Sequence, residues 1–107
     1  MNVIEALEFG RARIAKGHSV GAAARDAEGK ECPPDSTQAC SWCAIGALDT
    51  NYKSYHGAYN YLLVVLRDTS LVSHYSDSHT QAEVIQLYDK AIELTKADIA
   101  REAEVSK

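Results

Sequence analysis

The sequence has few of the features that mark disulfide-rich, membrane or secreted proteins. Its three cysteines, Cys32, Cys40 and Cys43, are an odd number that cannot close into a complete set of disulfides within one chain. Its longest apolar run, residues 61–66, is far shorter than the ~20 residues of a membrane-spanning helix. The opening Met-Asn-Val-Ile-Glu lacks the basic and apolar regions of a signal peptide. We therefore expect free thiols, no membrane association and a cytoplasmic location.

Basic charge is also scarce. Eleven lysine and arginine residues stand against fifteen aspartate and glutamate residues, which gives a formal net charge of −4. Binding to a phosphate backbone needs an excess of basic charge on one face, so direct nucleic-acid binding is not expected. Acidic and basic residues are also interspersed along the chain, and the pattern therefore gives no support to a continuous acidic surface that mimics a nucleic acid.

The composition that is present is that of a folded domain. Hydrophobic residues make up 46% and charged residues 24% of the 107 residues, close to the averages for soluble globular proteins. A chain of this length buries roughly two thirds of the surface that its unfolded form exposes, which allows one real core. Neither an internal repeat nor a linker divides the chain. We expect a single compact helical domain over residues 1–107.

The spacing of apolar residues predicts a mainly α fold of about four helices, the first over residues 3–16. Asn2 and Glu5 have the spacing of a capping box, and Gly17 is expected to end the helix in a left-handed conformation. Further helices are predicted over residues 54–67 and over 80–102. The latter opens with a Thr-Gln-Ala-Glu capping box.

The remaining helix is predicted over residues 37–48, after the break at Pro33-Pro34. This segment is apolar nearly all round, the pattern of a buried central helix. Its small residues allow close backbone approach, and its large residues give it bulk: Ala39, Cys43, Gly46 and Ala47 against Trp42, Ile45 and Leu48. Residues 68–79, by contrast, are expected to be a polar connection.

The region between the first two predicted helices, residues 18–31, has two interpretations. Helix propensity is high over residues 22–28. The segment Asp26-Ala-Glu-Gly-Lys30 is also a good tight turn, with Gly29 at a position that favours a positive φ. We favour the second interpretation, a small hairpin of residues 20–25 and 30–32 that packs on the helices.

Three ordered motifs then resemble a family of small bacterial and phage proteins of unknown function. They are Ala24-Arg-Asp26 with Gly29, Trp42-Cys-Ala-Ile-Gly-Ala-Leu48 and Thr80-Gln-Ala-Glu-Val-Ile85. Where that family has Trp-Asn-Asp, this chain has Tyr75-Ser-Asp77. The resemblance implies a compact helical domain associated with phages or mobile elements, and it brings no catalytic residues.

One candidate chemistry is a thiol or zinc site. Cys40 and Cys43 are spaced as Cys-x-x-Cys, and His56, His74 and His79 could add a ligand. Cys40 in the first turn of the predicted 37–48 helix would also have a lowered thiol pKa. Paired zinc-binding cysteines usually lie in a turn that contains glycine, however, and buried free cysteines are common. We expect neither a metal nor another cofactor, and no enzymatic activity.

The preferred function is therefore that of a non-enzymatic module that binds another protein. Tyrosines with a rigid ring and a polar tip are typical of interface hot spots, and loops often carry function. An inhibitor of a host defence complex, similar to anti-CRISPR proteins, is the specific hypothesis, while the partner's identity and the oligomeric state stay open. The candidate binding residues are Tyr52, Tyr55, Tyr59, His74, Asp77 and His79.

Overall fold

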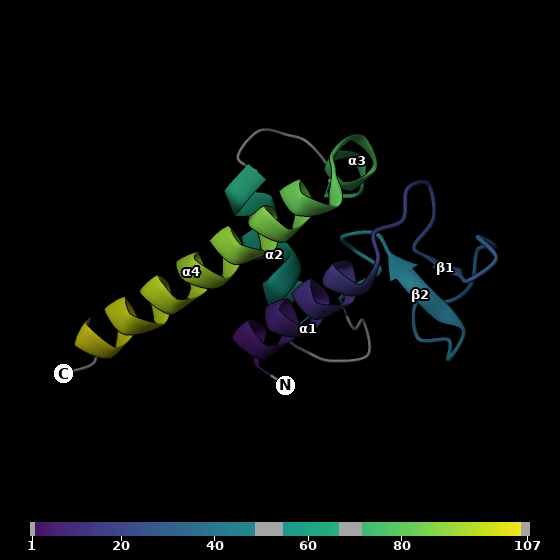
Figure 1. The fold of residues 1–107 in the computed structure, drawn as a ribbon. Helices are drawn as coiled ribbons and strands as arrows, with labels where there is room; N and C mark the ends of the chain where they lie inside the picture. Colours follow the sequence, from purple (N-terminus) through teal and green to yellow (C-terminus); the bar gives the residue numbers. More distant parts are fainter. Residues whose placement is uncertain (1, 49–54, 67–71, 106–107) are drawn as a thin grey trace.

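The computed structural model describes residues 2–48, 55–66 and 72–105, and within them the chain forms four helices and two short strands. In chain order these are α1 (Val3–Lys16), β1 (Ala24–Asp26), β2 (Ala39–Trp42), α2 (Tyr55–Leu66), α3 (Val72–Ser78) and α4 (Gln81–Val105). Figure 1 shows α1 and α4 side by side in opposite directions, with α2 packed against both and the strands beyond the C-terminal end of α1. The mainly α fold class, with a small hairpin between the first two helices, is confirmed.

The predicted start of α1 is confirmed in detail. The Asn2 side chain accepts a hydrogen bond from the Glu5 amide at 2.8 Å, and the Glu5 carboxylate accepts one from the Asn2 amide at 3.2 Å. The left-handed end at Gly17 is wrong, because Gly17 is extended at φ −179°. A side chain at Gly17 would lie 2.5 Å from the Cys40 carbonyl oxygen, so this glycine allows β2 to approach the end of α1.

The long last helix is also confirmed at its start. The Glu83 amide donates to the Thr80 hydroxyl at 3.2 Å, and the Glu83 carboxylate accepts from the Thr80 amide at 2.9 Å. Hydrogen bonding of the Glu83 carboxylate to the Thr80 backbone amide, and then to the Thr80 side chain, lowers the pKa of the Glu83 carboxyl. The helix continues to Val105, three residues beyond the predicted end near Glu102.

The predicted central helix over residues 37–48 is wrong. Its first part is β2, which lies between two extended neighbours, and its second part, residues 44–47, is a compact turn. Strand β1 pairs with one edge of β2. Along the other edge the Trp42 amide donates to the Gly17 carbonyl, and the Ser19 amide donates to the Trp42 carbonyl, both at 3.0 Å. The small apolar residues that suggested a central helix instead let this turn be buried.

The hairpin prediction is right about the turn and wrong about the main partner. The Asp26–Lys30 turn is present, with Gly29 at φ +83°, and Arg25 forms an isolated bridge with Glu31. The longer pairing, however, is between β1 and β2, with Ala24 opposite Trp42. Because the Cys32 amide also donates to the Ala24 carbonyl, β1 has neighbours on both sides.

The predicted polar connection over residues 68–79 contains a helix. Residues 72–78 form α3, whose Val72 and Ser76 are fully buried one turn apart. Two buried side chains on one face were too weak a periodic signal to mark a helix of this length. Residues 68–71 lie outside the described part of the chain.

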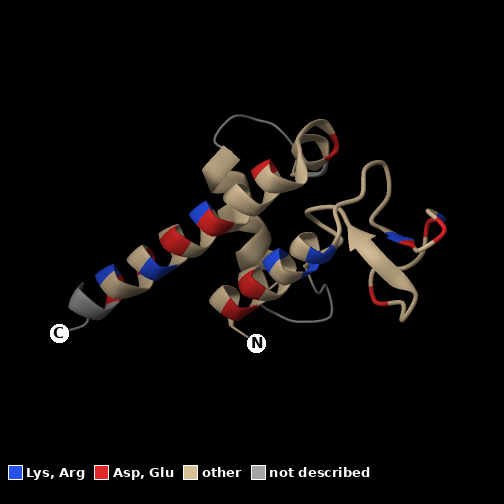
Figure 2. Ribbon diagram, in the orientation of Figure 1, with Lys and Arg blue, Asp and Glu red and all other residues tan. Residues whose placement is uncertain are grey.

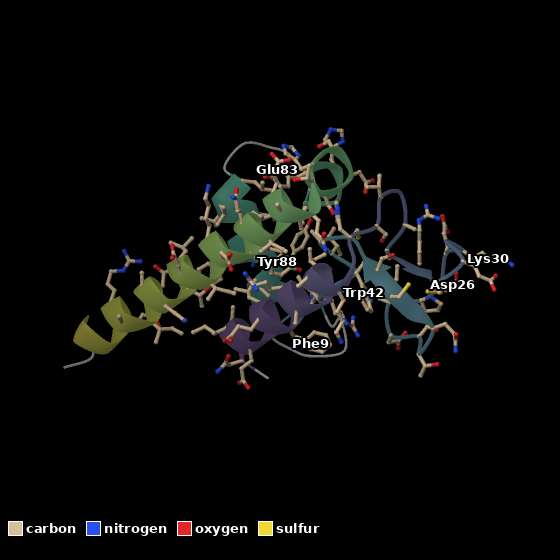
Figure 3. The ribbon with its side chains drawn as sticks, in the orientation of Figure 1. Phe9, Asp26, Lys30, Trp42, Glu83 and Tyr88 are labelled. Atoms are coloured by element: carbon tan, nitrogen blue, oxygen red, sulfur yellow. The ribbon has the colours of Figure 1, made fainter. Side chains whose placement is uncertain are left out.

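Tyr88 is the largest fully buried side chain in the described core, and it lies where α1, α4 and the 43–48 segment meet (Figure 3). Its ring fits against α1 because residue 10 is glycine, where a Cβ would come within 2.6 Å of the ring. Its hydroxyl donates to the Ala44 carbonyl at 2.5 Å. Burial raises the pKa of Tyr88 well above its ordinary value.

Lysine, arginine, aspartate and glutamate residues occur along α1, along α4 and around the turn after β1, whereas α2 contains none of these four residue types (Figure 2). Arg11 of α1 and Asp89 of α4 form a half-exposed ion pair, with Nε 2.5 Å from Oδ1. One turn further along, near the C-terminal end of α1, the Gln81 side chain donates to the Ile14 carbonyl at 2.7 Å. None of the helices in the described residues is both long enough and apolar enough to cross a bilayer.

Tyr88→Phe is expected to lower the free energy of unfolding at pH 7 by ~1–2 kcal/mol. The substitution keeps the ring but leaves the buried Ala44 carbonyl without its hydroxyl partner. Urea unfolding followed by circular dichroism measures this loss.

The same variant tests the raised pKa of Tyr88. Above the ordinary tyrosine pKa of ~10, unfolded Tyr88 releases its proton while the folded residue retains it, so wild-type stability falls as the pH rises. The variant lacks this contribution, and the stability gap between the two proteins should narrow from pH 9 to pH 11. A constant gap over that range would contradict the assignment.

Candidate functional site

An open pocket of about 420 Å³ lies between the β region and α3. We call it the apolar pocket, since most of its described lining residues are small or hydrophobic. They are Gly21, Ala22, Ala23, Pro34, Cys43, Ile45, Gly46 and Asp77. The pocket thus gathers segments that are far apart in the sequence.

Two of these segments touch closely at one side of the pocket. The Cys43 amide donates to the Ala23 carbonyl at 3.1 Å. Gly46 lies against the same peptide, and a Cβ at this position would be only 2.0 Å from the Ala23 carbonyl oxygen. Any larger residue at position 46 would therefore push the two segments apart. The Gly46 amide donates to the Cys43 sulfur at 3.3 Å, which fixes the buried thiol.

α3 is fixed against this region by Ser76. The Ser76 hydroxyl oxygen accepts from the Ala44 amide at 2.9 Å and lies 3.0 Å from His18 Nε2. A serine hydrogen-bonded to a histidine is the arrangement of a nucleophile and its base. Ser76 is 0% exposed, however, so its oxygen is out of reach of a substrate. The arrangement joins α3 to the 43–48 segment and to His18, the second residue after the end of α1.

Asp77, the next residue, fixes the rim of the pocket. Its Oδ1 accepts from the Gly21 amide at 3.0 Å, and this links α3 to the loop before β1. The carboxylate itself is exposed to solvent. Asp77 is therefore the predicted site residue that the structure places at the apolar pocket.

The two predicted histidines near Asp77 do not line the pocket. His74 is exposed, whereas His79 is half-buried. The His79 ring stacks on Tyr75 with centroids 3.7 Å apart, and its Nδ1 lies 2.8 Å from the Tyr75 carbonyl oxygen. His79 thus stabilises the connection between α3 and α4.

The predicted tyrosines lie at the start of α2. Tyr55 and Tyr59 are half-buried, stack with centroids 6.1 Å apart and pack against the core. Burial, followed by the nearby Tyr59 and Cys43, raises the pKa of Tyr55. Tyr52 lies outside the described residues. Part of the ring surface that a partner could contact is therefore already used inside the molecule.

The cysteines do not form a common site. All are free, with Cys32 half-buried, Cys40 exposed and Cys43 buried. Because Cys40 lies in β2, the first-turn helix effect expected at its thiol is absent. Partial burial and the nearby Asp26 raise the pKa of the Cys32 thiol. In the part of the chain that the structure describes, no three of the His, Cys, Asp and Glu side chains are grouped so as to hold a metal ion.

Sequence reasoning missed His18, the role of Ser76 and most of the pocket lining. The available signal was the pair of small-residue runs, Gly21-Ala-Ala-Ala24 and Cys43-Ala-Ile-Gly-Ala47. Small residues in both runs allow two backbones to touch, as Ala23 and Gly46 do. The sequence pattern indicates close packing only for the second run, and it predicts a helix there.

Comparison with known proteins gives a family without a function. A family model described as a family of unknown function, DUF6197, matches residues 1–94. No curated protein and no solved structure matches the chain. The match covers most of the chain, including every residue that lines the apolar pocket.

Ser76→Ala is expected to lower the free energy of unfolding by ~2–3 kcal/mol, because it leaves the buried Ala44 amide without an acceptor. The matched control is Ser78→Ala in the same helix. Ser78 is exposed and bonds mainly to carbonyls of its own helix, so its loss should stay within ~0.5 kcal/mol. Equal effects in urea unfolding would show that the Ser76 hydroxyl is not structural.

Proposed function

We propose that this chain, which belongs to the DUF6197 family, is a non-enzymatic module that binds another protein through the apolar pocket. The observation that carries the proposal is the pocket itself, an open concavity with apolar walls and a charged residue at its rim. Such concavities receive the anchor side chains of a partner, which dominate the energy of many interfaces. Val20, next to the pocket in sequence, is 49% exposed and adds apolar surface on the same loop.

The rigidity of the walls supports this proposal. Backbone hydrogen bonds and the close contact at Gly46 hold the 21–23 and 43–46 segments together. A preformed site binds with a smaller loss of conformational entropy than one that must order itself. The pocket therefore has the fixed shape that selective recognition of a partner requires.

The chemistry of the nearby polar groups supports binding rather than catalysis. The Ser76 hydroxyl is fully buried, and the Cys43 thiol accepts a hydrogen bond from the backbone. Asp77 is committed through one oxygen to the Gly21 amide. Ser76, Cys43 and Asp77, the three groups near the pocket that could have acted as a nucleophile or a base, thus each have a structural partner.

The biological setting that we propose is inhibition of a host defence complex by a phage or mobile-element protein in the cytoplasm. This setting is supported by the small size of the chain, its net charge of −4 and its ordered family motifs. An acidic protein of this size can occupy a basic surface that otherwise binds nucleic acid, through protein contacts and without binding nucleic acid itself. The Tyr52, Tyr55 and Tyr59 set is the alternative contact surface.

Ala23→Glu is expected to weaken partner capture by ~10-fold or more, since it places a charge in an apolar anchor site. Ala23 is exposed, so the substitution should not unfold the protein. Ala27→Glu is the matched control, because Ala27 is also exposed but lies on the turn after β1 and does not line the pocket. Quantitative pull-down from host lysate, repeated with the purified partner, measures the effect.

The same pull-down experiment distinguishes the pocket from the tyrosines as the binding surface, and it tests the host-defence hypothesis. Equal capture by wild type and Ala23→Glu, with loss in Tyr52→Ala, would assign binding to the tyrosines and contradict the pocket. A captured partner unrelated to host defence would overturn the inhibitor hypothesis while leaving the binding module intact.

A further inference from the structure

Asp77 gives the apolar pocket a specific chemical character. It is the only acidic or basic side chain among the described residues that line the pocket. The other walls are alkyl groups, backbone and the Cys43 sulfur, which accepts a hydrogen bond from the Gly46 amide. A ligand that fills this space must therefore present an apolar body, and one polar group at the rim.

The Asp77 carboxylate is held in place with one oxygen still available. Oδ1 accepts from the Gly21 amide at 3.0 Å, while Oδ2 has no hydrogen-bond donor within the described residues. The ion pairs that join described residues are Arg11–Asp89, Lys30–Glu28 and Arg101–Asp98, so none of them uses Asp77. Because Asp77 is exposed to solvent, the Oδ2 atom of this fixed carboxylate is available to pair with a cation.

Arg25 is a basic group close to Gly21 at this rim, and its guanidinium already has hydrogen-bond partners. Its guanidinium donates to the Val20 carbonyl at 3.1 Å and to the Gly29 carbonyl at 2.9 Å. Its Nη2 lies 3.6 Å from the place where a Gly21 Cβ would be. A second planar guanidinium, from a partner's arginine, would have to fit beside that of Arg25. It would also need both oxygens of the Asp77 carboxylate for bidentate binding, whereas a compact ammonium group needs only one.

We infer that the apolar pocket receives a primary ammonium group on an alkyl stem, the chemistry of a lysine side chain on the partner protein. The methylene groups of the stem pack on the walls at Ala22, Ala23 and Ile45, and the ammonium group pairs with Asp77. The net charge of −4 favours such a basic partner surface. This inference rests on the proposed function for its biological partner, and on the pocket alone for its chemistry.

A small-molecule titration tests the chemistry without any partner. The full chain is labelled with ¹⁵N and titrated with 1-aminopentane at pH 7, and separately with 1-pentanol, its neutral counterpart. The amine should shift the amide signals of Gly21 to Ala23 and of Cys43 to Gly46, with a dissociation constant ~3-fold or more below that of the alcohol. In Asp77→Asn, which keeps an oxygen acceptor for the Gly21 amide, the two constants should become equal.

Glu93→Gln is the matched control for a lost carboxylate. Glu93 lines a different hollow, between α2 and α4, together with Val64, Val65, Lys90 and Leu94. This variant should keep the full preference for the amine. The inference is overturned if wild type binds amine and alcohol equally, if the shifted signals lie elsewhere, or if Asp77→Asn keeps the preference.

Failure of the lysine inference and failure of the proposed protein-binding function give different results. Amine binding at the pocket, without any captured partner that depends on Ala23, would support the inference on chemistry and overturn the protein-binding role. If Ala23→Glu loses partner capture but the wild type binds amine and alcohol equally, the protein-binding role is supported and the lysine assignment is overturned.

Discussion

The Ala44 peptide is the point on which the architecture depends. Its amide donates to the Ser76 hydroxyl of α3, and its carbonyl accepts from the Tyr88 hydroxyl of α4. Two hydrogen bonds lie within the surrounding turn, from the Ala47 amide to the Cys43 carbonyl and from the Leu48 amide to the Ile45 carbonyl. The buried amide and carbonyl of Ala44 need partners from outside the turn. Side chains from two helices supply the missing partners. The same hydrogen bonds hold α3 and α4 at fixed positions relative to the β region.

The same arrangement explains how a chain of small residues produces a shaped pocket. Small side chains at positions 43, 44, 46 and 47 let the turn come against the 21–23 segment, and Gly46 gives the closest approach. The gap that remains between these backbones and Asp77 is the apolar pocket. Its shape is therefore set by backbone positions and by a few buried hydrogen bonds, rather than by large side chains that could adopt other rotamers.

The elements that the sequence predicted correctly are those with local causes. The capping boxes at Asn2 and Thr80 involve residues three positions apart, so a short window of sequence contains the whole interaction. The 37–48 segment was predicted wrongly because its decisive partners, Ser76 and Tyr88, lie 32 and 44 residues away from Ala44. Asp77, which the sequence suggests as a binding residue because of its loop-like context, lies in α3 at the rim of the pocket. Ala23 and Gly46 carry no such signal, because their contribution is the absence of a large side chain.

The attachment of the turn to α4 also affects the order in which the molecule can be built on the ribosome. Every described residue that lines the apolar pocket precedes residue 78, but the hydroxyl that donates to the Ala44 carbonyl belongs to Tyr88. A nascent chain that has emerged only as far as α3 therefore has all the pocket walls without the support behind them. The pocket is completed late in synthesis, after most of the first half of α4 has left the exit tunnel.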